Sequence, residues 1–238
     1  TLSHSGSNTI NYAKTWNDHH IDVLYGFTYQ TFRYVDMSAN ADGYFIDDVN
    51  TNDLAAVPSK ETVNIASNLE DQTRLANLAR INYNYKSRYY LTISGRADGG
   101  SNFAENHKWG FFPSAAFKWN LKEEKFLKDF NGINLLALRL SGGVSGNDAI
   151  ARYQSLAMIN SISNGYIFNG ATPVAYLPSR IANEGLTWEK TATYNAGLDV
   201  TVLNNRLDFT IEAYQSKTSD LLLTVQLPAH TGYTSRLS

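Results

Sequence analysis

The chain has 238 residues, of which 43% are hydrophobic and 13% aromatic, and its formal net charge is −2. This charge provides no basic surface for nucleic acid, and the absence of cysteine excludes disulfides and thiolate metal sites. No run of 18 apolar residues occurs, which excludes transmembrane helices. A membrane-spanning β-barrel remains compatible, because half of each barrel strand faces a polar lumen.

Eight segments alternate between apolar and polar residues, as expected for β-strands with two different faces. They cover residues 8–15, 20–33, 74–86, 88–99, 107–120, 134–146, 189–203 and 206–217. The alternation is clearest at 81–98, where apolar odd positions such as Ile81 and Tyr83 alternate with polar even ones such as Asn82 and Asn84. The pattern predicts an all-β, antiparallel protein.

Short and long connections alternate along the chain. Tight turns are predicted at 16–19, 86–88 and 204–205, and long connections at 34–73, 100–106 and 147–188. The last has room for an extra hairpin, and residues 122–129 predict one or two turns of amphipathic helix. Outer-membrane barrels have short periplasmic turns and long extracellular loops. The order therefore indicates an up-and-down transmembrane barrel.

Aromatic residues near the strand ends favour the same interpretation. Trp109 and Trp119 lie ten residues apart on one face, close to the ~9–11 residues of a tilted spanning strand. Alternation also fits a soluble all-β carbohydrate-binding module with two packed sheets. The two alternatives place the same apolar residues differently. In such a module they would be covered by the second sheet, and in a barrel they would face lipid: Ile81, Tyr83, Leu198, Val200 and Phe209.

Specific motifs go beyond this pattern. They are RINYNYKSRY at 80–89, RADGGSNF at 96–103, WGFFPSAAFKW at 109–119, EEKFLK at 123–128, LSGGVSGND at 140–148, LTWEKT at 186–191, YNAGLD at 194–199, NNRL at 204–207 and the run 214–223. In this order, over about residues 75–235, they resemble the barrel of SusC/RagA-type TonB-linked outer-membrane transporters. Gly100 and Asn102 depart from the family, which usually has Ser and Arg there.

The resemblance implies a barrel of 22 strands, of which this chain supplies about eight to nine. Residues 1–238 are then part of the barrel domain, and the plug domain and its energy-coupling box are expected outside this chain. The implied function is TonB-dependent import of oligosaccharides or peptides across a Bacteroidetes-type outer membrane, without enzymatic activity or cofactor. A SusD-like surface lipoprotein, TonB acting through the plug, and outer-membrane lipid are the implied partners. A passive porin is a further alternative.

Neither catalysis nor metal binding finds a convincing motif. The glycine-rich run 142–146 lacks the spacing of a nucleophile elbow. His19 and His20 are adjacent on a predicted strand, so they are expected to point to opposite faces. The acidic run 47–53 imitates the start of a calcium loop, but Asp53 stands where that loop needs glycine. A solvated loop is the favoured interpretation.

Charged residues on the lumen face are the remaining candidates for ligand binding: Arg96, Asp98, Arg139, Asp199 and Glu212, with Asp208 beside them. Such charges either pair with one another and with a plug, or touch the transported solute. Aromatic residues of the 147–188 connection either stack on sugar rings, hold the loop together or contact a lid protein: Tyr153, Tyr166, Phe168 and Tyr176. Trp188 is expected to anchor the barrel rim.

Overall fold

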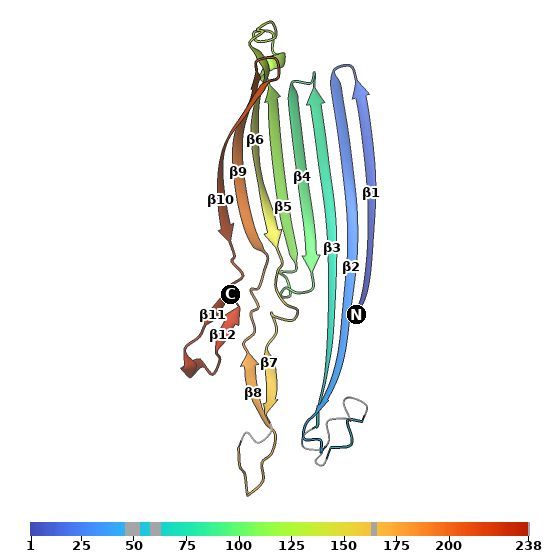
Figure 1. The fold of residues 1–238 in the computed structure, drawn as a ribbon, viewed down its shortest axis with the longest axis vertical. Helices are drawn as coiled ribbons and strands as arrows, with labels where there is room; N and C mark the ends of the chain where they lie inside the picture. The colour runs from blue at the N-terminus through green and yellow to red at the C-terminus, as the bar shows by residue number, and fades with distance from the viewer. Residues whose placement is uncertain (46–52, 58–62, 163–165, 238) are drawn as a thin grey trace.

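A computed structural model describes residues 1–45, 53–57, 63–162 and 166–237. Its main element is one antiparallel sheet with the strand order β1-β2-β3-β4-β5-β6-β9-β10 (Figure 1). The strands are β1 Leu2–Trp16, β2 His19–Ala41, β3 Val63–Tyr85, β4 Tyr89–Gly100, β5 Trp109–Asn120, β6 Ile133–Asn147, β9 Glu189–Val202 and β10 Leu207–Ser219. This up-and-down order confirms the predicted fold, and the tight turns gather at the upper end in Figure 1.

Two small hairpins lie outside the main sheet. β7 Met158–Ile162 pairs with β8 Ala175–Arg180, and β11 Thr224–Gln226 pairs with β12 Ser235–Leu237. The first is the extra hairpin for which the 147–188 connection has room. Short 3-10 turns occur at η3 Leu121–Glu123 and η4 Ala229–Thr231. In the part of the chain that the structure describes, no helix has the length and apolarity to cross a membrane.

The amphipathic helix predicted at 122–129 is wrong. After η3 the chain continues as turns to residue 129. The physical reason lies in Lys122, whose Nζ donates hydrogen bonds to three backbone carbonyl oxygens, those of Leu127 at 3.0 Å, Lys128 at 3.1 Å and Phe130 at 2.7 Å. One side chain thus satisfies acceptors that a helix would have satisfied through its own backbone.

The long connection predicted at 34–73 is also wrong at both of its ends, because residues 34–41 and 63–73 are strand. β2 and β3 stay paired as far as Ala41 and Val63, well beyond the ends of their neighbours (Figure 1). Alternation does continue there, since Val35, Met37 and Ala39 take one face and polar residues the other. The sequence therefore contains the signal for this extension, but its small and polar residues make the signal weak.

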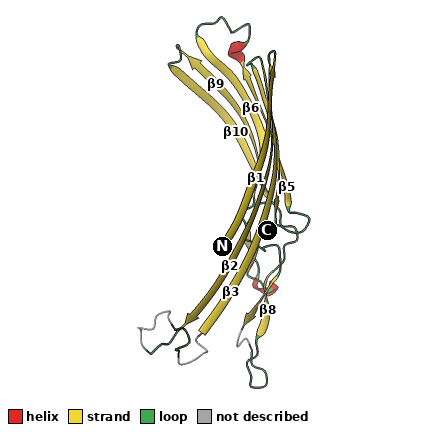
Figure 2. Cartoon of the chain, turned by 90° about the vertical axis from the view of Figure 1, so that its right-hand side faces the viewer, coloured by secondary structure: helices red, strands yellow, loops and turns green. Residues whose placement is uncertain are grey.

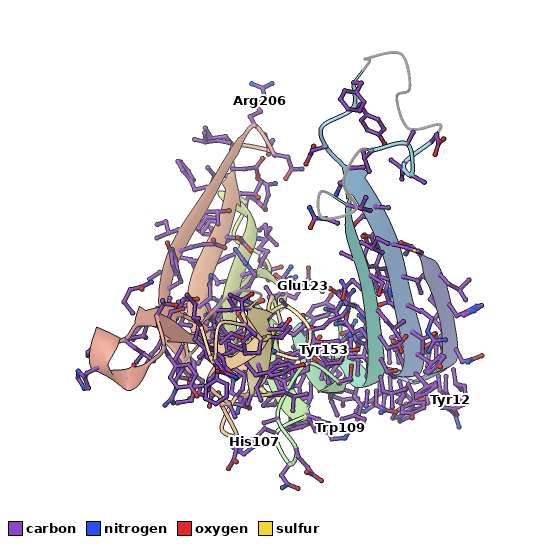
Figure 3. The ribbon with its side chains drawn as sticks, turned by 90° about the horizontal axis from the view of Figure 1, so that it is seen from below. Tyr12, His107, Trp109, Glu123, Tyr153 and Arg206 are labelled. Atoms are coloured by element: carbon purple, nitrogen blue, oxygen red, sulfur yellow. The ribbon has the colours of Figure 1, made fainter. Side chains whose placement is uncertain are left out.

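The sheet curves into a trough with chemically different faces (Figures 2 and 3). Tyr12 and Trp109 project from its convex side, and Tyr153 lies within its concave side (Figure 3). On the convex side Ile81 remains 44% exposed and Phe209 48% exposed. Among the described residues no second sheet covers these positions. The packed two-sheet arrangement expected of a soluble module is therefore absent from the described structure.

A row of stacked rings crosses five strands on the convex face, next to the tight turns. It comprises Trp16, His19, Tyr85, Tyr89 and Trp119, with successive ring centroids 5.4, 4.6, 6.3 and 6.2 Å apart. Cross-strand register places these residues opposite one another. Rows of Trp and Tyr are typical of the level at which a barrel meets the membrane–water interface.

Glu124 ties this aromatic row to the turn that follows β5. Its carboxylate accepts hydrogen bonds from the Tyr89 hydroxyl and from the Trp119 indole N–H, the latter at 3.1 Å, and Arg88 lies 3.4 Å away. The hydrogen bond from Tyr89, followed by that from Trp119, holds the pKa of Glu124 below its ordinary value, while burial opposes the shift. These contacts give Glu124 of the 123–128 motif a structural role.

Because the folded-state pKa of Glu124 is lowered, its stabilising contribution is fully present above the pKa of the unfolded glutamate, about 4.3. The contribution is lost as pH falls through the lower, folded-state value. We expect the difference in denaturation midpoint between wild type and Glu124→Gln to shrink as pH falls from neutral into that range. Denaturant titrations of both proteins across this pH range measure it. A difference that stays constant with pH would contradict the assignment.

The largest buried side chains form a small core at the end of β5 opposite the tight turns. Phe103 and Leu186 are 2% exposed and Trp188 is 6% exposed, and Phe112 and Ala104 complete the cluster. The ring centroid of Trp188 lies 4.7 Å from that of Phe103, and its Nε1 donates to the backbone oxygen of Lys108 at 3.1 Å. Trp188 is thus fixed by packing and by a hydrogen bond beyond the end of β5, and its role as a rim anchor stays a prediction.

Glycines make room for the ring of Phe112. A Cβ atom on Gly146 would lie 2.1 Å from Phe112 Cζ, and one on Gly110 would lie 2.5 Å from the same atom. Over this stretch β5 no longer pairs with β6, since their ladder ends at Ser114 and Gly143. Gly146 of the 140–148 motif thus serves the packing of Phe112.

Candidate functional site

The concave face carries a network of short polar contacts between strands. The Asn82 amide donates to Asp22 at 3.1 Å and its oxygen accepts from the Thr92 hydroxyl at 2.9 Å. Hydroxyl pairs occur at Ser94–Ser114 and Thr193–Ser216 at 2.7 and 2.8 Å. These contacts satisfy polar groups without removing them from water. The concave face therefore has the chemistry of a hydrated passage.

Three of the five candidate residues meet on β6, β9 and β10. The Arg139 guanidinium binds Asp199 through two hydrogen bonds of 2.7 and 2.9 Å and Glu212 through a third of 2.7 Å. Thr210 also donates to Asp199, at 3.2 Å. Gly197 leaves space for the guanidinium, because a Cβ there would lie 3.1 Å from Arg139 Nη2. Bidentate Arg–carboxylate geometry holds this cluster in one arrangement.

Arg96 and Asp98 form a second, separate pair on β4. Arg96 Nε donates to both carboxylate oxygens of Asp98, at 2.9 and 2.7 Å. The register aligns Arg139 with Lys118 and, through it, with Tyr90. Arg96 lies six residues further along β4, which corresponds to about 20 Å along the strand. The structure thus divides the five candidates between two clusters. Asp208 belongs to neither, since it accepts from Thr201 at 2.6 Å.

A hollow of about 390 Å³ opens beside Arg96 and Asp98 on the concave face. Its lining also includes Thr28, Gln30 and Arg74, with Asp148 and Trp188 on the side of the small core. Arg74 Nη2 lies 2.7 Å from Asp148 Oδ2, which makes a second ion pair in the lining of the hollow. Sequence patterns missed Arg74 and Asp148, because the two residues are brought together only by the loop after β6.

That loop crosses from β6 to the distant β2–β3 hairpin. The Arg152 guanidinium pairs with Glu70 and lies 4.2 Å from the ring centroid of Phe32. The backbone N–H of Asp71 donates to the hydroxyl of Tyr153 at 2.8 Å. Of the alternatives for Tyr153, the structure shows the one in which it fastens a long loop.

The other aromatic candidates of this connection are differently placed. Tyr166, Phe168 and Tyr176 are 50%, 71% and 71% exposed on or beside the β7–β8 hairpin. In the described part of the chain, none of the three lines the hollow beside Arg96 or forms a hydrogen bond with the Arg139 cluster. They remain available for an external contact.

Metal binding gains no geometric support within the described residues, where no group of three or more His, Cys, Asp or Glu side chains converges. The two adjacent histidines point to opposite faces, as expected: His19 Nδ1 lies 2.6 Å from the Tyr83 hydroxyl, and His20 Nδ1 lies 2.7 Å from Thr15 Oγ1. The calcium-like run lies mostly outside the described residues. Its last member, Asp53, accepts a hydrogen bond from the backbone N–H of Ala55.

Comparisons with known proteins agree on one class. The family model described as "TonB dependent receptor-like, beta-barrel" matches residues 1–236. A TonB-dependent receptor of Formosa agariphila is 34% identical over 238 residues, covering this whole chain and 23% of that protein. The TonB-dependent receptor SusC of Bacteroides thetaiotaomicron is 40% identical over 169 residues, or 70% of this chain and 17% of SusC.

Solved structures give the same result. The structure of the RagAB peptide transporter matches with a TM-score of 0.84 and 26% identity, covering 99% of this chain and 26% of that one. The RagAB peptide importer in its open-open state matches with a TM-score of 0.81 at 26% identity, over 99% of this chain and 25% of that one. The chain thus spans about a quarter of the length of these relatives.

Proposed function

The chain belongs to the TonB-dependent receptor β-barrel family of outer-membrane proteins, in its SusC/RagA-like branch, and on this basis we propose that it forms part of the wall and extracellular loops of an active importer of oligosaccharides or peptides. Residues 1–238 then belong entirely to the barrel domain. The supporting observation is the contrast between its faces: exposed apolar side chains such as Ile81 and Phe209 on the convex side, and ion pairs on the concave side. Lipid suits the first face and a water-filled passage the second.

In this role the sheet contributes no covalent chemistry. Its backbone ladder satisfies hydrogen-bonding groups that would otherwise be costly in lipid, and its concave side chains line the route of the solute. Opening of the route belongs to a plug outside this chain, on which TonB acts. The exposed convex positions also argue against the soluble carbohydrate-binding module, which needs them buried.

A surface lipoprotein of the SusD type is the proposed partner at the extracellular end. The β7–β8 hairpin supports it, because residues 156–179 contain no charged side chain. Several of its apolar residues are strongly exposed, among them Ile159, Ile167, Phe168 and Tyr176. Exposed apolar side chains concentrated in a segment without charge are typical of an interaction site. The hairpin also projects past the end of the neighbouring strands (Figure 1).

Disruption of the encoding gene in its host tests the proposed import. We expect the strain to lose uptake of one class of labelled oligosaccharide or peptide, and we expect collapse of the proton gradient to abolish the same uptake in the parent strain. The full-length protein should be recovered with the outer membrane. Recovery in the aqueous fraction would contradict the barrel assignment, and uptake that survives loss of the gradient would instead indicate a passive porin.

A further inference from the structure

The hollow on the concave face combines hydrogen-bond donors and acceptors in one lining. Arg96 and Asp98 of β4 line it together with Arg74 of the adjacent strand β3, with Asp148 from the loop after β6 and with the hydroxyl of Thr28. Its volume of about 390 Å³ lies within the range of about 300–1,000 Å³ found for small-ligand sites. The space is large enough for a ligand unit to contact both ion pairs at once.

The donors of the hollow are only partly used within the protein. Within the described part of the chain, Arg96 donates hydrogen bonds through its Nε atom alone, which leaves its two Nη groups for another acceptor. Its side chain is 50% exposed, and that of Arg74 is 44% exposed. Both guanidinium groups can therefore donate to a ligand without giving up their carboxylate partners.

The charges of the hollow are balanced. Each of its arginines contacts an aspartate at 2.7 Å, so the lining offers paired charge with no excess of either sign. A carboxylate or ammonium group would need an unpaired counter-charge to compensate its own dehydration. A hydroxyl group both donates and accepts, and matches a guanidinium beside a carboxylate without adding charge. The lining thus favours a neutral, hydroxyl-rich ligand over a charged one.

We infer that this hollow is a subsite for a neutral sugar unit of an oligosaccharide, an inference that rests on the proposed import function. The Arg96–Asp98 and Arg74–Asp148 pairs hold the sugar, with further contacts from Thr28 and Gln30. The Trp188 ring contributes an apolar edge, while its packing against Phe103 keeps it fixed. Sequence patterns singled out Arg96 and Asp98 for this face, and the loop after β6 adds Asp148 to the same lining.

Calorimetric titration of the full-length protein in detergent tests the subsite. The probes are malto-, xylo- and fructo-oligosaccharides, with a mixture of short peptides as the competing class. We expect at least one neutral oligosaccharide to bind. We expect Arg96→Gln to lower the affinity for it about tenfold or more, since a charged hydrogen-bond donor is lost. Lys118→Gln is the matched control, because Lys118 lies on the same face near the Arg139 cluster.

Removal of Arg96 leaves Asp98 without its partner, so a second variant avoids this disturbance. Thr28→Val combined with Gln30→Leu removes uncharged groups from exposed positions of β2. The double variant should also lower the affinity for the same oligosaccharide about tenfold. Asn11→Leu on neighbouring β1 should leave this affinity unchanged. Heat-modifiable mobility on a gel confirms that each variant is folded.

Unchanged oligosaccharide affinity in both hollow variants would overturn the inference, as would binding of peptides alone by the wild type. Failure to bind any of the neutral oligosaccharides would overturn it equally. None of these results would remove the proposed import function, which depends on the gradient-driven uptake measured in cells. Conversely, failure of the proposed import function would appear as unchanged uptake after gene disruption, a result that the titration does not measure.

Discussion

Arginine in place of Ala115 should destabilise the folded barrel by about 2–4 kcal/mol, the cost of this side chain near the middle of a lipid-facing surface. Ala115 lies on the convex face of β5 between Trp109 and Trp119, opposite Ile93 of β4. If those two tryptophans mark the membrane interfaces, Ala115 lies close to the centre of the bilayer. The guanidinium would then replace a methyl group in contact with acyl chains.

Ala116 supplies the matched control, because it is the adjacent residue on the same strand, is also an exposed alanine and points to the concave face. Ala116→Arg places the same charge in the hydrated passage and should change stability by only a few tenths of a kcal/mol. Unfolding of the full-length protein in lipid vesicles, followed by tryptophan fluorescence in denaturant, measures both variants. Equal destabilisation of the two would contradict the assignment of the faces, and a larger effect at Ala116 would show that they are assigned the wrong way round.

A methyl group at Gly146 should cost about 1–3 kcal/mol of folding stability, as overpacking of a filled core does. The added Cβ would lie 2.1 Å from Phe112 Cζ, which is far inside van der Waals contact. Phe112 has little freedom to withdraw, since Trp188 packs edge-on against it with ring centroids 5.4 Å apart. The strain therefore spreads into the small core.

Two comparisons separate this clash from the ordinary effect of adding a methyl group to a strand. Gly6→Ala is the control, because a Cβ on Gly6 of β1 would meet no atom within 4 Å. In a Phe112→Ala background, Gly146→Ala should lose most of its effect, which a double-mutant cycle measures as a coupling free energy. Additive effects of the two substitutions would show that Gly146 matters for another reason.

The period-two pattern predicted the eight strands, their order and the faces of Ile81 and Arg96, because these depend only on local alternation and short turns. It also placed Arg139 and Asp199 on the same face, where the structure joins them. What it missed depends on contacts between distant segments. Phe112, for example, is an apolar residue on the polar face whose role appears only once the loop carrying Phe103 folds against it.

The crossing loop illustrates the same limit. Arg152 pairs with Glu70, 82 positions earlier in the chain, and no local pattern relates the two. The candidate hollow shares this origin, since one of its ion pairs comes from the strand wall and the other needs the loop. Sequence alone could identify the lumen-facing charges, but not which of them enclose a space.

The extension of β2 and β3 gives the extracellular rim an uneven height. β3 begins at Val63, whereas its pairing with β4 begins only at Arg74, so the hairpin rises roughly 35 Å beyond that neighbour at about 3.3 Å per residue. Over residues 63–70 the outer side of β3 therefore has no strand partner among the described residues, which leaves its backbone N–H and C=O groups open to pairing with another segment.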